Sequence, residues 1–239
     1  MYKLRLREDR GKTQTDWMTS FHTFSFSQYF DPFHMGFSDL RAINDDIIDP
    51  DGGFGMHRHS NMEIVSFIFS GELEHKDSTG ASLILKPGDV QKISSGSGVM
   101  HSEFNVSSIK PVHLLQVWIL PDKKNTEPEY ERRSFSLKDM KNKFCLTASQ
   151  DGRKKSLKLK QDAEIYQAVI DVDKTLLYPV LKRRKIWIQV VEGAVEINSN
   201  IMEAGDGMSI VDEIGMIEIS GVDISSKILL FNLRNLRVE

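Results

Sequence analysis

Short apolar runs bounded by turn-forming residues recur along most of the chain. The clearest are IVSFIFSG, SLILKPGD, PVHLLQVWILP, KIWIQVVEG and SSKILLFNL. They are rich in β-branched and aromatic residues, and Gly, Pro or Asp separates most of them, which is typical of strands. The pattern therefore predicts an all-β protein organised as a barrel or a sandwich.

One segment differs from this pattern. In SLKDMKNKF, Ser136 is placed to cap a helical turn. Asp139, three residues later, is placed to bond back to Ser136 and so complete a capping box. This segment lies in the most polar long section of the chain, which runs from Glu127 to about Ser156. We therefore expect an N-terminal domain at 1–127, a linker with a short helix at 128–156, and a C-terminal domain at 157–239.

The two halves of the sequence follow the same plan. Each contains an apolar strand, a turn glycine, a second strand, a hairpin and a Gly-Asp pair. Gly71 and Gly88 mark this plan in the first half, and Gly193 and Gly205 mark it in the second. Short Gly-Asp turns also recur by chance in β proteins, but the whole repeated unit predicts two similar β-barrels in one chain.

Two residue pairs in the first half could hold a metal ion. His57 and His59 are two positions apart, and so are His101 and Glu103. Side chains two positions apart on a strand point to the same face, and glycines precede each pair where the backbone must approach closely. Facing one another, the pairs would supply three imidazoles and a carboxylate. That set suits Fe(II), and also Mn, Co, Ni, Cu or Zn, with one or two positions left open.

Glu63 is a second candidate carboxylate. Counted by parity from His57 and His59, it would share their face of the strand. It could be a ligand, a base, or a partner that holds an imidazole in one tautomer, and we favour the last of these roles. The residues alone do not decide between Glu63 and Glu103 as the ligand.

The second half lacks the candidate ligands. When the halves are aligned on their turn glycines and Gly-Asp pairs, the four positions correspond to Pro179, Leu181, Glu218 and Ser220. We therefore expect one metal site, in the first half. Of the other histidines, we expect His113 to be a hydrogen-bonded core residue, and His22, His34 and His75 have no partner at ligand spacing.

Composition limits the classes of partner. The formal net charge is -3, which argues against a surface that neutralises phosphates, so no nucleic-acid partner is expected. The single cysteine fits a reducing compartment. The charged first residues contain no apolar signal segment, and no stretch approaches the ~20 apolar residues of a membrane helix. We expect a soluble cytoplasmic protein that does not bind membranes.

The first half resembles a cupin barrel. The opening motif runs from Gly53 through the histidine pair and Glu63 to Gly71, and the closing motif contains Gly88, His101 and Asn105. The spacing before His101 is similar to that of the pirin family in particular. So are HTFSFSQYFDPFHMGFSDLRAINDD, DSTGASLILKPGDVQKISSGSGVMHSEFN and WIQVVEGAVEIN, so that the resemblance covers essentially the whole chain.

This resemblance implies a bicupin fold, and it implies that His57, His59, His101 and Glu103 are the metal ligands, which favours Glu103 over Glu63. It further implies a quercetin 2,3-dioxygenase activity that cleaves the central ring of a flavonol with O2, with Fe(II) as the expected metal. Glu103 or Glu63 would then take the proton of the substrate hydroxyl.

A different function class uses the same ligands. Eukaryotic pirins resemble this chain and are described as co-regulators of transcription, which implies a metal-containing module that binds a partner protein. A third reading, a cupin that acts on sugars or small acids, needs basic groups near the site. Only Arg58 is close, and the alternation of strand residues points it away from the metal.

Overall fold

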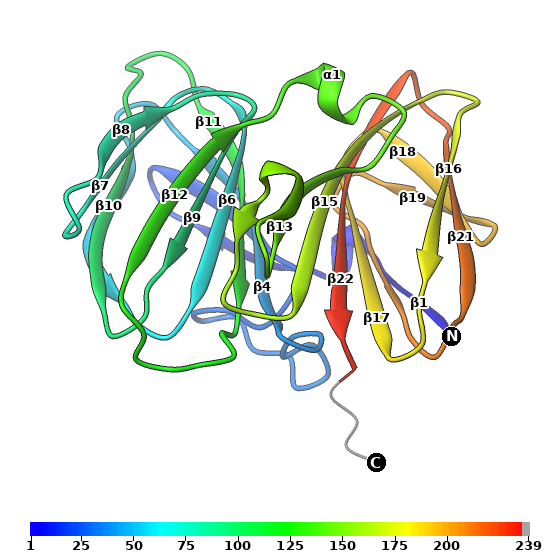
Figure 1. Cartoon of the computed structure of the whole chain (residues 1–239). Coiled ribbons are helices and arrows are strands. Elements are labelled where there is room, and N and C mark those ends of the chain that lie inside the picture. The colour runs from blue at the N-terminus through cyan, green and yellow to red at the C-terminus, as the bar shows by residue number, and fades with distance from the viewer. Residues whose placement is uncertain (236–239) are drawn as a thin grey trace. The chain divides into compact units, whose positions relative to one another are not determined.

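The computed structural model describes residues 1–235, and strands dominate it, which confirms the all-β prediction (Figure 1). The chain forms two compact units. The first barrel contains Gly11–Phe135 and Leu157–Gln161, and the second barrel contains Met1–Arg10, Ser136–Ser156 and the chain from Asp162 onward. These divisions differ from the expected boundaries at 127 and 157. Within the described residues, no helix is long and apolar enough to cross a membrane.

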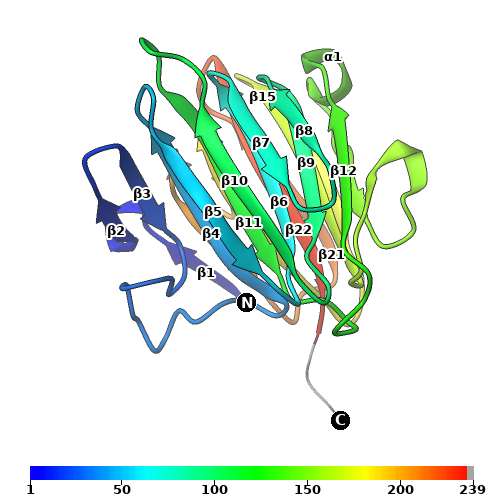
Figure 2. The ribbon, with the colours of Figure 1, turned by 90° about the vertical axis from the view of Figure 1, so that its left-hand side faces the viewer.

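The first barrel is built from two antiparallel sheets. Its larger sheet has the order β12-β9-β6-β11-β4-β3-β2 and its smaller sheet the order β5-β10-β7-β8, in which β5 is an edge strand (Figure 2). The larger sheet contains β2 (Gly11–Gln14), β3 (Met18–His22), β4 (Leu40–Ile48), β6 (Glu63–Ser70), β9 (Asp89–Ser94), β11 (Val112–Ile119) and β12 (Glu129–Ser134). The smaller sheet contains β5 (Gly53–His59), β7 (Leu73–Asp77), β8 (Ser82–Leu85) and β10 (Val99–Asn105).

The second barrel also has two sheets. Its larger sheet includes, in order, β1 (Tyr2–Arg5), β20 (Gly207–Ile210), β17 (Arg184–Glu192), β22 (Ser225–Arg234), β15 (Ala163–Asp171) and β13 (Cys145–Ser149). Its smaller sheet has the order β16 (Thr175–Val180), β21 (Gly215–Gly221), β18 (Ala194–Ile197) and β19 (Asn200–Glu203). The short elements are the 3-10 helices Arg7–Asp9 and Arg153–Lys155, the helix α1 (Leu137–Met140) and the strand β14 (Leu157–Lys158).

The expected helix is present, although it is short. The backbone N–H of Ser136 donates to the Asp139 carboxylate at 2.8 Å, and the Ser136 hydroxyl donates to it at 2.6 Å. Both bonds run from Ser136 to Asp139, so the carboxylate satisfies the backbone N–H that precedes α1, as the sequence predicts.

The strand order confirms the internal repeat. In the larger sheets, β9-β6-β11-β4 corresponds to β20-β17-β22-β15, and in the smaller sheets β5-β10-β7-β8 corresponds to β16-β21-β18-β19. Gly88 and Gly205 both have positive φ values, of 89° and 96°, which side chains rarely adopt. Asp89 and Asp206, which follow them, each accept a hydrogen bond from the backbone N–H three residues earlier. The same turn therefore closes the same hairpin in both barrels, and the chain is a bicupin.

The interiors of the two barrels differ in polarity. In the second barrel, buried apolar residues fill the core, among them Ala168, Ile170, Leu176, Tyr178, Ile186, Ile188, Val195, Ile217 and Leu230. In the first barrel, several buried positions are polar, namely Ser20, His22, Asn44, Asp46, Ser66, Gln91, Glu103 and Gln116. Because buried polar groups are stable only with partners, these residues must bond to one another or to a ligand. This places the candidate site inside the first barrel.

Candidate metal centre

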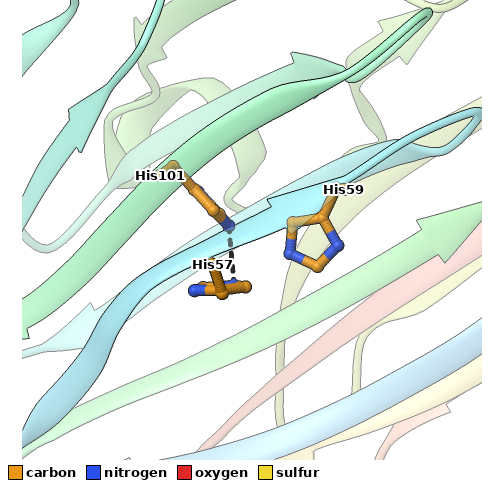
Figure 3. A group of neighbouring side chains, drawn as sticks. All are labelled: His57, His59 and His101. Carbon is orange, nitrogen blue, oxygen red and sulfur yellow. Dashed lines mark hydrogen bonds between the residues drawn. The ribbon is translucent and has the colours of Figure 1, made fainter.

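Three histidines meet where β5 pairs with β10. The register places His101 directly opposite His57, and the ring centroids of His57, His59 and His101 lie 4.4–4.8 Å apart (Figure 3). The nitrogens of all three rings could bind one ion, since one nitrogen of each lies within 4.8 Å of the others. Arg58 points away, as expected, and its guanidinium donates to the Ser97 carbonyl at 3.0 Å.

His59 and His101 have the neutral form expected of metal ligands. The His57 Nδ1–H donates to the Gly55 carbonyl at 2.8 Å, and its Nε2 lies 3.0 Å from the Nε2 of His101. Burial, with a smaller contribution from the neighbouring imidazoles, lowers the pKa of His101 to about 3 and that of His59 to about 4. A neutral imidazole is the form that binds a divalent transition metal, and the Gly55 carbonyl fixes the orientation of the His57 ring.

The Glu103 carboxylate lies within 4.8 Å of ligand atoms of His101 and His75, rather than in the group formed by His57, His59 and His101. Two amide side chains hold it. The Nε2 of Gln91 donates to its Oε1 at 2.6 Å, and the Nε2 of Gln116 donates to its Oε2 at 2.9 Å. The indole N–H of Trp118 donates to the Oε1 of Gln116, and the Tyr130 hydroxyl donates to the Oε1 of Gln91. An indole N–H can only donate, so it turns the NH2 of Gln116 toward Glu103. The network thus orients the carboxylate, and each oxygen keeps a lone pair for a metal.

Glu63 lies outside this cluster. The prediction that it shares the face of His57 and His59 is wrong, because β5 ends at His59 and Glu63 begins the next strand, β6. Its Oε2 accepts hydrogen bonds from the Ser94 hydroxyl and from the backbone N–H of Lys160. Burial raises the pKa of Glu63, and the bonds of its carboxylate to Ser94 and Lys160 keep it turned to these residues.

His75 joins the cluster, although nothing in its local sequence indicated it. The register of β7 with β10 places it opposite Glu103, and one nitrogen of its ring lies within 4.8 Å of ligand atoms of His101 and Glu103. Its Nε2 bonds to the Oδ2 of Asp77 at 2.9 Å, and both side chains are fully buried. Its ring stacks on Tyr130 at 4.8 Å. His75 therefore packs behind His101 and Glu103 and holds them from the side of β7.

A cavity of about 220 Å³ begins at the histidines. That volume is several times the ~30 Å³ that one water occupies in the liquid, so a larger molecule can enter. Its walls combine the apolar side chains of Met18, Phe26, Phe54 and Trp118 with polar groups from Ser20, His22, Asn44, Asp46, Gln116 and Glu103. An aromatic cavity with a few convergent polar groups is typical of a small-molecule site.

The close packing of β5 on β10 gives a first prediction. A Cβ at Gly53 would lie 2.5 Å from the Glu103 carbonyl oxygen and 2.6 Å from the Phe104 Cα, whereas a Cβ at Gly55 would meet nothing within 4 Å. We expect Gly53→Ala to lower the free energy of unfolding by about 1–3 kcal/mol, because the strands must separate. Gly55→Ala, on the same strand, should change it by less than about 1 kcal/mol. Equal effects in urea unfolding would contradict this account of the contact.

Comparison with known proteins agrees with the fold. The sequence model of the family described as Pirin matches residues 3–119, and that described as the quercetinase C-terminal cupin domain matches residues 146–233. A quercetin 2,3-dioxygenase of Escherichia coli K12 is 42% identical over 233 residues, which is 98% of this chain and 99% of the relative. The chain belongs to the pirin family. A pirin-like protein of Caulobacter vibrioides is 33% identical over 92% of this chain and 94% of its own length.

Solved pirin structures resemble this one closely. The crystal structure of YhhW from Escherichia coli superposes with a TM-score of 0.94 at 40% identity and covers 100% of both chains. A second structure of the bacterial pirin YhhW, in complex with nickel(II), gives a TM-score of 0.93 at 41% identity over 99% of this chain and 100% of that one. In this pirin, all seven histidines lie before residue 114, and neither β16 nor β21 contains one. The second barrel therefore repeats the fold without the histidine cluster.

Proposed function

We propose that this pirin is a metal-dependent dioxygenase that opens the central ring of a flavonol such as quercetin with O2, releasing carbon monoxide and a depside. His57, His59, His101 and Glu103 would hold the metal, with Fe(II) as the native ion. The observation that carries the proposal is that three imidazoles meet at an aromatic cavity, with the amide-held carboxylate of Glu103 beside His101. The name of the E. coli relative, a quercetin 2,3-dioxygenase, supports the substrate.

The cavity suits a planar polyphenol. The bound metal would act as a Lewis acid toward a substrate hydroxyl. Trp118 contacts Phe26 edge-on at 5.0 Å between ring centroids, and it contacts His59 in the same way at 4.9 Å. These rings offer flat apolar surfaces on which an aromatic substrate can pack and from which water is excluded. The amide-held carboxylate of Glu103 adds a fixed polar group beside the histidines.

The test measures metal and turnover on one preparation. We expect about one transition metal per chain by elemental analysis, and uptake of O2 with release of carbon monoxide when quercetin is added. Turnover near the ~10 s⁻¹ typical of enzymes would establish the activity. A metal-loaded protein with negligible O2 uptake would overturn the proposed reaction.

One observation favours the alternative, a metal-containing module that binds a partner protein. Phe30 and Phe33 lie in the loop between β3 and β4, and their side chains are 71% and 86% exposed. Exposed aromatic residues are frequent at protein interfaces. If quercetin turnover is negligible, Phe30→Ser with Phe33→Ser is the pair of substitutions that should weaken such a complex while the metal content stays unchanged.

A further inference from the structure

Asp46 is a buried carboxyl group that lines the cavity and is not one of the proposed metal ligands. It lies on β4 with 3% of its surface exposed, and it lines the same cavity as His57 and His59. The register places Ser20 of β3 opposite it, and its carboxyl group is hydrogen-bonded to the Ser20 hydroxyl. A buried carboxyl group is unfavourable when charged unless something stabilises the charge, so its position at a binding cavity needs an explanation.

The surroundings of Asp46 allow both its protonated and its ionised form to be populated at neutral pH. The pKa of Asp46 is raised to about 7, mainly by burial. The nearby charges of Asp45 and Glu103 add to this rise, whereas the Ser20 hydrogen bond and His113 oppose it. The other titratable groups that line the cavity are His22, His57, His59 and Glu103, and within the described residues no Lys or Arg side chain lines it. A carboxyl group of this kind can take up and return a proton near physiological pH.

The other carboxylates considered for proton transfer are less suited to it. Both oxygens of Glu103 already accept hydrogen bonds from amide groups, and the same oxygens are the proposed metal ligands. Glu63 bonds to Ser94 and Lys160 and does not line the cavity. Asp46 is therefore the carboxyl group of the cavity whose partner, a hydroxyl, can either donate to it or accept from it.

A row of polar side chains leads from Asp46 toward the outside of the barrel. The Ser20 hydroxyl lies 3.4 Å from the Nδ1 of His22, which also bonds to the Oδ1 of Asn44 at 2.9 Å. On its other side, the Nε2 of His22 bonds to the hydroxyl of Thr13 at 2.8 Å. His22 is buried whereas Thr13 is partly exposed. These groups form a route along which a proton taken up by Asp46 can be exchanged with solvent.

We propose that Asp46 binds an acidic hydroxyl of the substrate and accepts its proton. The substrate O–H bond breaks, the proton moves to a carboxylate oxygen of Asp46, and the electron pair stays on the substrate oxygen, which becomes an anion. No oxidation accompanies this step. The inference rests on the proposed function, because it needs a substrate with an acidic hydroxyl, and it adds a proton acceptor on the wall formed by β3, β4 and β11.

The test uses quercetin binding to the full-length protein stripped of metal, so that no turnover occurs. Affinity and the absorption spectrum of the bound flavonol are measured from pH 5.5 to 8.5, with the free flavonol at each pH as reference. In the wild type, we expect binding to tighten about tenfold as Asp46 ionises, since a hydrogen bond to a charged group is gained. The bound flavonol should then show the red-shifted band of its anion. In Asp46→Asn, both changes should be lost.

Asp45→Asn is the matched control. Asp45 is the next residue on the strand, faces the opposite side and bonds to His113 at 2.8 Å. This variant should keep the pH-dependent tightening, with its midpoint moved to lower pH because a neighbouring negative charge is removed. Ser20→Ala should move the midpoint to higher pH, because it removes a hydrogen bond that lowers the pKa of Asp46. This second variant keeps the test valid if Asp46→Asn does not fold.

The outcomes separate this inference from the proposed function. If the wild type binds quercetin and Asp46→Asn shows the same pH dependence, the role of Asp46 is wrong while the dioxygenase proposal stands. If the metal-free and the metal-loaded wild type both fail to bind quercetin at every pH, the flavonol is the wrong substrate and both proposals fall.

In the metal-loaded enzyme, Asp46→Asn should lower kcat by about 10²-fold with a smaller change in KM.

Discussion

His101→Ala is expected to reduce metal affinity by more than about 100-fold and to abolish quercetin turnover. His101 is the central member of the cluster: its Nε2 lies 3.0 Å from that of His57, and its ring lies 4.8 Å from that of His59. It is also fully buried, so its side chain is fixed by packing at the centre of the cluster. Loss of a buried ligand removes a metal bond, and even the partners that orient ligands typically contribute 10–100-fold to affinity.

Two measurements check this expectation. Calorimetric titration with Ni(II) gives the affinity, and elemental analysis of purified protein gives the metal content. The control is His113→Ala, which removes a histidine that bonds to Asp45 outside the cavity. His113→Ala should retain the metal and most of the turnover. A His101→Ala protein that keeps about one metal per chain would show that the three histidines are not the ligands.

Glu103→Gln is expected to have the second largest effect, lowering metal affinity and turnover by about 100-fold each. The substitution removes the negative charge from the set of ligands. It also brings a third NH2 group toward those of Gln91 and Gln116, which both donate to Glu103. Trp118 holds Gln116 in this orientation, so the new amide cannot satisfy both neighbours. A buried donor without a partner destabilises the fold by about 1–3 kcal/mol.

Glu63→Gln provides the comparison for this variant. Glu63 is equally buried, but its carboxylate bonds to Ser94 and Lys160 instead of lying in the cluster. It should lose stability in urea unfolding and keep its metal. If Glu103→Gln bound Ni(II) as tightly as the wild type, Glu103 would be a structural residue and the metal would be held by imidazoles alone.

Much of the fold and part of the site could be predicted from the sequence, because both depend on short-range patterns. Alternation along a strand places His57 and His59 on the same face, and the register of β5 with β10 brings them to His101. Turn glycines and Gly-Asp pairs mark both hairpins, so the repeat of the barrel is also visible in the sequence. These signals can be read from the sequence because each depends on the position of a residue relative to its near neighbours.

The errors arose where longer-range geometry decides the result. The parity argument for Glu63 assumed one continuous strand, but Asn61 has a φ of 54° in a turn between β5 and β6. His75 reaches the cluster through the register of β7 with β10, which the local sequence does not specify. Gln116 and Asp46 lie in strands that are otherwise largely apolar, at positions that face the interior. A polar residue at an inward-facing position of an apolar strand is the feature of the sequence that marks both.

The edge position of β5 has a consequence for the behaviour of the protein without its metal. β5 is bonded to β10 on one side only, so its backbone can separate from the sheet more easily than that of a central strand. An ion held by ligands from both strands would link them. Amide hydrogens of β5 should therefore exchange with deuterium faster in the metal-free protein than in the loaded one, while exchange in the second barrel stays the same. Metal occupancy would then be readable as local opening of one strand, and a protease that cuts unpaired backbone could report it.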